Sequence, residues 1–170
     1  YTNLVNLFKS TNLSKPGKIF LFVVLLSNMA FSQNAGFGSL ASDRTEPIEF
    51  NSERLIFNQE KNLAELFDRV KITQGRTILS AKYVKAIYSK YSSLETVYAE
   101  GNVELKSDQD IARADEAIYS LTNNSISLTG NAKLIQGENH LMANQILINT
   151  ETGLTQLLGS VTTIISPSID

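Results

Sequence analysis

The chain of 170 residues contains no cysteine and only one histidine. The lack of cysteine excludes disulfides, thiolate metal sites and thiol nucleophiles. With His140 alone, neither a histidine metal cluster nor a pair of catalytic histidines can be built, and a serine–histidine arrangement would depend on this single residue. We therefore expect no enzyme activity, no metal and no cofactor.

Basic residues and prolines are also scarce. The chain has 15 lysines and arginines against 17 acidic residues, a net charge of −2. Nucleic acid is not expected as a partner, because neutralising phosphates requires a basic surface. No proline lies between Pro47 and Pro167, so proline breaks no strand in this stretch.

The acidic pair Asp108 and Asp110 lacks the further ligands and the glycine of a known calcium loop.

The segment 1–32 has the pattern of a secretory signal peptide. Lys9, Lys15 and Lys18 precede an uninterrupted apolar run from Ile19 to Leu26, and small and polar residues follow up to Ser32. The run is much shorter than the roughly 20 residues that span a bilayer. We expect cleavage after Ser32.

The segments that follow define the expected domain organisation. Removal of residues 1–32 takes away three lysines and no acid, which leaves a net charge of −5. Residues 33–46 are small and polar and are typical of a flexible lead-in. We expect one domain over residues 47–166 and a short tail over residues 167–170. The alternative interpretation retains residues 19–31 as a membrane anchor.

Two markers recur along the chain in a common phase. The glycine marker occurs as Asp68-Arg69-Val70, Gly101-Asn102-Val103, Gly130-Asn131-Ala132 and Gly159-Ser160-Val161, and its last three copies are evenly spaced. The alanine marker occurs at Ser52, Ala81, Ala114 and Ala143. The alanine marker precedes the glycine marker by the same number of residues in three copies. The number is larger from Ala81 to Gly101, and the polar residues 89–92 within this copy suggest a longer turn. Such a spacing indicates a degenerate repeat.

Apolar residues alternate with polar ones around each glycine marker. Around Gly130 the apolar positions are Ile126, Leu128, Ala132 and Leu134. Alternation with a period of two predicts a strand with one apolar face. Residues 62–68 also fit helical spacing, but the phase of the repeat favours a strand. We predict that residues 47–166 are nearly all β, with units that stack and pack face to face.

The order of these segments resembles a known family. Residues 47–52 (PIEFNS), the Gly-Asn-Val and Gly-Asn-Ala strands and residues 143–148 (ANQILI) resemble the periplasmic lipopolysaccharide-transport LptA family and its OstA-like relatives. The resemblance covers roughly residues 44–166; the first unit departs from it, with Asp68-Arg69 in place of glycine and asparagine. It implies an all-β, elongated, open antiparallel β-jelly roll built from degenerate repeats of about 29 residues, a length within the range of repeat proteins. Its inner face would take the acyl chains of lipid A.

The resemblance also implies partners and a location. Members join head to tail through their terminal strands and bridge the two membranes of the envelope. The implied partners are lipopolysaccharide, an LptC-like inner-membrane protein, an LptD-like outer-membrane protein and further copies of the chain, in the periplasm after signal-peptide cleavage. The alternatives are an LptC-like, membrane-anchored member of the same pathway, a structural β-repeat assembly without lipid cargo, and an enzyme on a repeat scaffold.

The alternation assigns residues to the inner face and to the two ends. The predicted lipid-binding residues are Ile48, Phe50, Leu55, Phe57, Leu66, Val70, Ile72, Val84, Val97, Val103, Leu105, Tyr119, Ile126, Leu128, Leu134, Ile146 and Ile148. The predicted edge residues for self-association or partner binding are Pro47, Glu49, Asn51, Val161, Thr163 and Ile165. The segment 161–166 (VTTIIS) is uncharged and β-branched, so it lacks the residues that usually protect a sheet edge.

Overall fold

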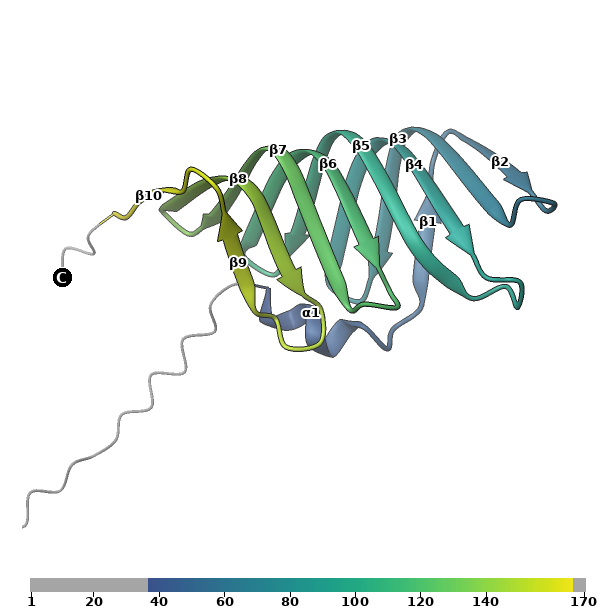
Figure 1. The fold of residues 1–170 in the computed structure, drawn as a ribbon, viewed down its shortest axis with the longest axis horizontal. Coiled ribbons are helices and arrows are strands. Elements are labelled where there is room, and N and C mark those ends of the chain that lie inside the picture. The colour runs from purple at the N-terminus through teal and green to yellow at the C-terminus, as the bar shows by residue number, and fades with distance from the viewer. Residues whose placement is uncertain (1–36, 167–170) are drawn as a thin grey trace, which may run out of the picture. The chain divides into compact units, whose positions relative to one another are not determined.

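The computed structural model of the chain describes residues 37–166, which form one helix and ten strands (Figure 1). The helix is α1 (Gly38–Asp43), and the strands are β1 (Ile48–Asn51), β2 (Arg54–Asn58), β3 (Leu63–Gln74), β4 (Thr77–Tyr88), β5 (Leu94–Ser107), β6 (Asp110–Ser120), β7 (Ser125–Gln136), β8 (Asn139–Asn149), β9 (Thr155–Leu158) and β10 (Thr162–Ile164). The predicted all-β class is confirmed. The strand prediction for residues 62–68 is also confirmed, because they fall almost entirely in β3.

Two predicted segments, the signal peptide over residues 1–32 and the tail over residues 167–170, lie outside the described residues. Within residues 37–166, no helix is long and apolar enough to cross a bilayer.

The strands form one antiparallel sheet whose two edges are not joined. The order along the sheet is β1-β3-β4-β5-β6-β7-β8-β10, with β2 added beside β3 and β9 added beside β8. Both β1 and β2 pair with β3, and both β9 and β10 pair with β8. Each edge is therefore one strand interrupted in its middle, and the predicted open antiparallel sheet is confirmed.

The long strands carry a bulge near their middle, and the sequence markers lie at these bulges. Register shifts occur in every pairing between β3 and β8. At three of them the chain has two successive residues with positive φ, as at Gly130 (76°) and Asn131 (49°). The third residues of the glycine markers pair with the alanine markers of the neighbouring strands: Val70 with Ala81, Val103 with Ala114 and Ala132 with Ala143. An extra residue in one strand bends it, so the markers are the positions at which the sheet folds.

The bulge at Gly130 requires glycine because a side chain of the paired strand β6 lies close to it. A Cβ atom on Gly130 would lie 2.6 Å from Asp115 Oδ2. In the first bulge Asp68 (φ 60°) and Arg69 (φ 49°) adopt the same left-handed backbone without glycine, and Arg69 forms an ion pair with Glu53. The departure from the family pattern in this unit therefore leaves the bend in place.

The bends divide the sheet into two walls that we name by their residues. Wall 1 comprises β1, β10 and residues 70–74, 77–81, 103–107, 110–114, 132–136 and 139–143. Wall 2 comprises β2, β9 and residues 63–67, 83–88, 94–100, 116–120, 125–129 and 145–149. The inner faces of both walls contribute to one hydrophobic cluster, which fixes the bent arrangement by removing apolar surface from water.

Candidate functional site

All predicted lipid-binding residues lie on the inner face of the bent sheet. Twelve of them are buried: Leu66, Val70, Ile72, Val84, Val97, Val103, Leu105, Ile126, Leu128, Leu134, Ile146 and Ile148. Three are partly buried and pack against this cluster: Ile48, Phe50 and Tyr119. The remaining two, Leu55 and Phe57, are 56% and 60% exposed. The alternation in the sequence thus identified the apolar face, while the role of these residues in lipid binding stays a prediction.

The two exposed members mark one end of the sheet. Leu55 and Phe57 pair with the buried residues Leu66 and Ala64, so they continue the inner face onto β2. They are exposed because no strand follows β2 at this edge. The apolar face therefore continues to the end of the sheet without being covered there.

The predicted edge residues lie at both ends of the sheet. Glu49 and Asn51 belong to β1, which pairs with β3 alone, and Pro47 directly precedes it. At the other end Thr163 belongs to β10, which pairs with β8 alone, and it is flanked by Val161 (51% exposed) and Ile165 (70% exposed). Both predicted edges are thus strand edges in the structure.

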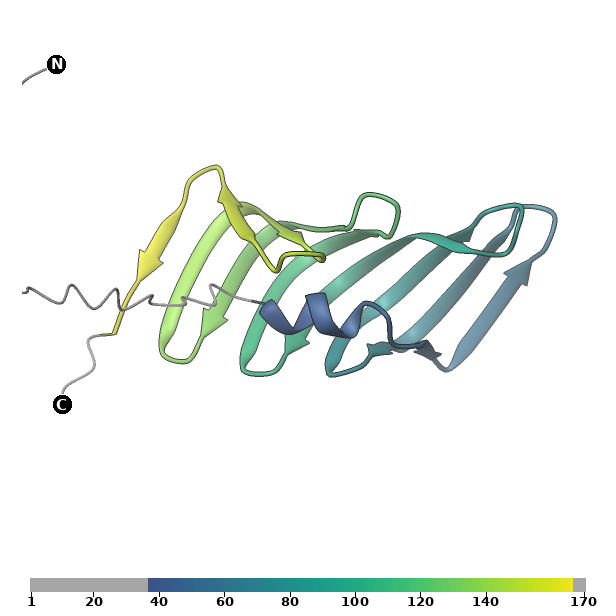
Figure 2. The same ribbon diagram turned by 90° about the horizontal axis from the view of Figure 1, so that it is seen from below.

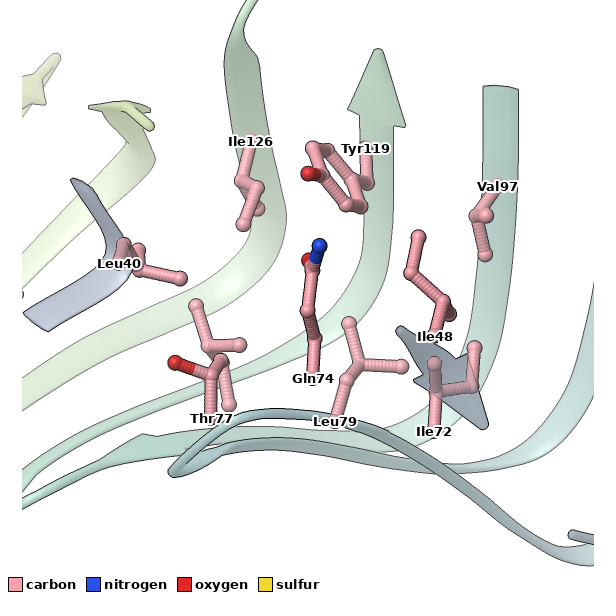
Figure 3. Close-up of a pocket in the computed structure, with 10 residues that line it drawn as sticks. Leu40, Ile48, Ile72, Gln74, Thr77, Leu79, Val97, Tyr119 and Ile126 are labelled. Atoms are coloured by element: carbon pink, nitrogen blue, oxygen red, sulfur yellow. The ribbon is translucent and has the colours of Figure 1, made fainter. Parts of the chain in front are cut away.

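A small apolar cavity lies between the walls (Figure 3). Its volume is about 30 Å³, and it is lined by Leu40, Ile48, Ile72, Gln74, Thr77, Leu79, Val97, Leu105, Tyr119 and Ile126. Figure 3 shows Ile72, Leu79 and Ile126 pointing into the same space from different strands. The cavity is therefore formed by side chains of wall 1, wall 2 and α1 together.

Four lining residues were not identified from the sequence. Thr77 and Leu79 are alternate residues of β4 on its inward-facing side, and Gln74 follows Ile72 at the same spacing in β3. The period-two pattern could therefore have assigned these three residues to the inner face. Leu40 belongs to a small, polar segment without periodicity. No local signal in the sequence indicates that this leucine enters the core.

The predicted lead-in differs from the expectation over residues 37–46. Gly38–Asp43 form α1, and Phe37 (1% exposed) and Leu40 (5% exposed) are buried in the core cluster. Seen from below, α1 crosses the space between two rows of hairpin turns (Figure 2). The expected apolar groove is therefore covered at this side, and the small cavity is lined in part by Leu40 of α1.

Polar contacts of Asp43 fix the end of α1. Its Oδ2 accepts hydrogen bonds from the Arg76 backbone N–H (2.9 Å) and from the Thr77 hydroxyl (3.0 Å). The backbone of Gly75 approaches so closely that a Cβ there would lie 2.6 Å from Asp43 Cγ. The carboxylate is itself buried, so these partners are needed to offset its lost hydration.

The remaining polar residues of the region lie close to residues 37–46 and the strand ends. Burial raises the pKa of the Tyr119 hydroxyl above its usual value, and the nearby Arg44 charge acts in the opposite direction. Asp110 accepts a hydrogen bond from the Phe37 backbone N–H (2.8 Å), and Asp108 accepts one from Arg76 Nη1 (3.1 Å). No group of three or more acidic or histidine side chains within residues 37–166 is placed to hold a metal ion. His140 Nδ1 is buried without a hydrogen-bond partner among these same residues.

Comparison with known proteins places the chain in a family. The family model described as LptA/(LptD N-terminal domain) LPS transport protein matches residues 49–154. The chain belongs to this family. The resemblance to the LptA family drawn from the sequence is thereby confirmed.

Relatives of the LptA family match along most of the chain. The lipopolysaccharide export system protein LptA of Haemophilus influenzae is 27% identical over 158 residues, which cover 86% of this chain and 91% of that protein. The lipopolysaccharide export system protein LptH of Pseudomonas aeruginosa is 28% identical over 157 residues, which cover 84% and 90%. The crystal structure of LptH from Pseudomonas aeruginosa, described as the LptA-homologous periplasmic component of the lipopolysaccharide transport device, superposes with a TM-score of 0.67 at 22% identity. It covers 74% of this chain and 99% of that one, and it supports the fold.

Proposed function

We propose that this LptA-family chain is a periplasmic lipopolysaccharide-transport protein that holds the acyl chains of lipid A between the walls of its sheet. The observation that carries the proposal is a continuous apolar inner face on a sheet whose edges are not joined. The relatives LptA and LptH are named lipopolysaccharide export system proteins. The proposed role of the chain is binding and shielding, without a chemical step.

The energetics of acyl chains in water explain why such a carrier is needed. Each buried methylene is worth about 0.8 kcal/mol, so a twelve-carbon chain in water costs on the order of 10 kcal/mol. Several such chains on one lipid prevent free diffusion through an aqueous compartment. The inner face offers aliphatic side chains from every long strand, as at Val84, Leu105 and Ile146, and their surface can replace water around the chains.

The strand edges support an extended assembly as part of the proposal. An edge strand presents unpaired N–H and C=O groups that can add a further strand. We infer that β9 and β10 of one molecule add to β1 and β2 of the next, so that copies join head to tail. At the ends of such an assembly, LptC-like inner-membrane and LptD-like outer-membrane proteins would offer the matching edges.

Photocrosslinking in cells tests the proposed lipid face with a matched pair of tyrosines. Tyr119 lines the cavity, whereas Tyr98 lies on the other face of the adjacent strand, where Lys85 Nζ is 4.8 Å from its ring centre. An aromatic photoreactive residue at position 119 is expected to capture lipopolysaccharide, and the same residue at position 98 is not. Phe50 and Lys133 provide a second pair with the same expectation.

The outcomes of this experiment separate the proposal from its alternatives. Equal capture from both faces would contradict the assignment of the inner face. Capture from neither face, while the protein still assembles, would favour a structural β-repeat assembly without lipid. N-terminal sequencing of the exported protein distinguishes cleavage after Ser32 from retention of residues 19–31 as in an LptC-like anchored member.

A further inference from the structure

Residues 37–46, which we call the strap, cover the side of the sheet opposite its bends. Their helix α1 has only six residues, has no side-chain cap at its N-terminus, and carries no acidic residue in its first turn. Helices this short are unstable on their own, because nucleation is costly and few hydrogen bonds follow it. The conformation of the strap therefore depends on what it touches.

The strap contacts both walls at the ends of their strands. On the side of wall 1, Asp43 binds the turn between β3 and β4, and the Ser39 hydroxyl contacts the buried hydroxyl of Ser107 at the end of β5. On the side of wall 2, the Arg44 guanidinium lies 3.4 Å from Glu151 in the turn between β8 and β9. The strap thus connects two rows of turns that no strand pairing joins.

The space beneath the strap is too small for the proposed ligand. The cavity measures about 30 Å³, whereas sites for small organic ligands typically measure about 300–1,000 Å³. The side chain of Leu40 lines this cavity and Phe37 is buried in the same core. An acyl chain can therefore enter here only if these side chains leave or the walls separate.

The strap is attached to the sheet more weakly than the strands are attached to one another. The strands on both sides are tied to their neighbours by continuous ladders of backbone hydrogen bonds. The strap has no such ladder; two apolar side chains, two ion pairs and a set of side-chain hydrogen bonds, several of them exposed to solvent, hold it. Elements whose hydrogen bonds are exposed to solvent open before the strands of the core.

We infer that the strap is a displaceable closure of the lipid site: it fills the space between the walls in the lipid-free protein, and acyl chains take its place. This inference rests on the proposed lipid-binding function and adds a competition between a segment of the chain and the ligand. The strap shields the apolar face from water until lipid arrives. Binding of an acyl chain then releases residues 37–46 from the walls.

A reversible disulfide tests the closure directly. Ser39 and Ser107 touch through their hydroxyl oxygens, so the double variant Ser39→Cys/Ser107→Cys places two sulfur atoms in reach of each other. No other cysteine is present in the chain. The oxidised protein keeps the strap closed, and reduction frees it in the same sample. The probe is fluorescently labelled lipopolysaccharide titrated into each form, with intact mass reporting the disulfide.

We expect the oxidised form to bind lipopolysaccharide at least about tenfold more weakly than the reduced form, because a locked segment cannot give way to the ligand. The matched control is Ser39→Cys alone under the same two conditions, for which no difference is expected. Equal binding of the oxidised and reduced double variant would overturn the inference and leave the proposed function standing. Failure of the disulfide to form would also overturn it, because the strap would then not lie against β5. If neither the wild type nor the reduced variant binds lipopolysaccharide, the proposed function itself fails.

Discussion

At the scale of single residues, the bends depend on a left-handed backbone conformation that few residues other than glycine adopt. Gly130 has φ 76° and faces Asp115 across the bulge, while Gly101 has φ 82° and faces the flexible side chain of Lys82. Gly137 has φ 59° in a hairpin turn, and a Cβ atom added there would meet nothing within 4 Å. The three glycines share a left-handed backbone and differ in what surrounds them.

Replacement of Gly130 by alanine should destabilise the protein more than the same replacement at Gly137. Both changes incur the cost of a left-handed alanine, about 1–2 kcal/mol. Only the change at Gly130 adds a clash with Asp115, for which overpacking suggests about 1–3 kcal/mol more. Urea denaturation of the two variants checks this, and equal midpoints would contradict the crowding at the bulge.

At the scale of elements, the sequence and the structure agree on the strands but not on the strap. The strands were predictable because alternation, turn residues and two phased markers all favour one pattern, and β3 formed despite its helical spacing. The strap was not predictable, because residues 37–46 lack periodicity and their helix depends on contacts with distant residues such as Ser107 and Glu151. Which inner-face residues pack and which stay open at an end also depends on neighbours that a local pattern does not reveal.

Truncation after Ser160 should abolish self-association and leave a folded monomer. It removes β10, whose three residues are all exposed and pair only with β8. The remaining core cluster contains no residue beyond position 160, so its packing should persist. Analytical ultracentrifugation checks the result, with truncation after Ser166 as the matched control. An unchanged distribution of oligomers would show that β10 is not part of the joint.

At the scale of the molecule, the two ends of the sheet are different surfaces. One end presents β1 and β2 with Leu55 and Phe57 exposed, and the other presents β9 and β10 with Val161 and Ile165 exposed. A joint between unlike surfaces is heterologous and produces open chains of copies rather than closed dimers. The assembly as a whole would then keep one free edge of each kind, at its two ends.

A mixing experiment should therefore yield dimers and nothing longer. The variant Leu55→Lys/Phe57→Lys places charges at exposed positions of the first end, and truncation after Ser160 removes β10 from the second end. Each variant alone should be monomeric, because charges at an edge oppose strand addition. Their mixture retains one intact edge of each kind and should form heterodimers by native mass spectrometry. Dimers of either variant by itself would indicate a joint between like surfaces.

The interruption of both edge strands has a consequence for the alignment of successive copies. At one edge the break falls at residues 52–53 between β1 and β2, and at the other it falls at residues 159–161 between β9 and β10. If an added strand shifted by two residues along the edge, its side chains would still point to the same face of the sheet. Its break would then no longer lie beside the break in the edge strand. Both edge strands are interrupted where wall 1 meets wall 2. An added strand can therefore pair along both walls in one register only. In the proposed head-to-tail assembly, the bend of the sheet would fix the register between copies, and the interiors of neighbouring copies would meet end to end as one conduit.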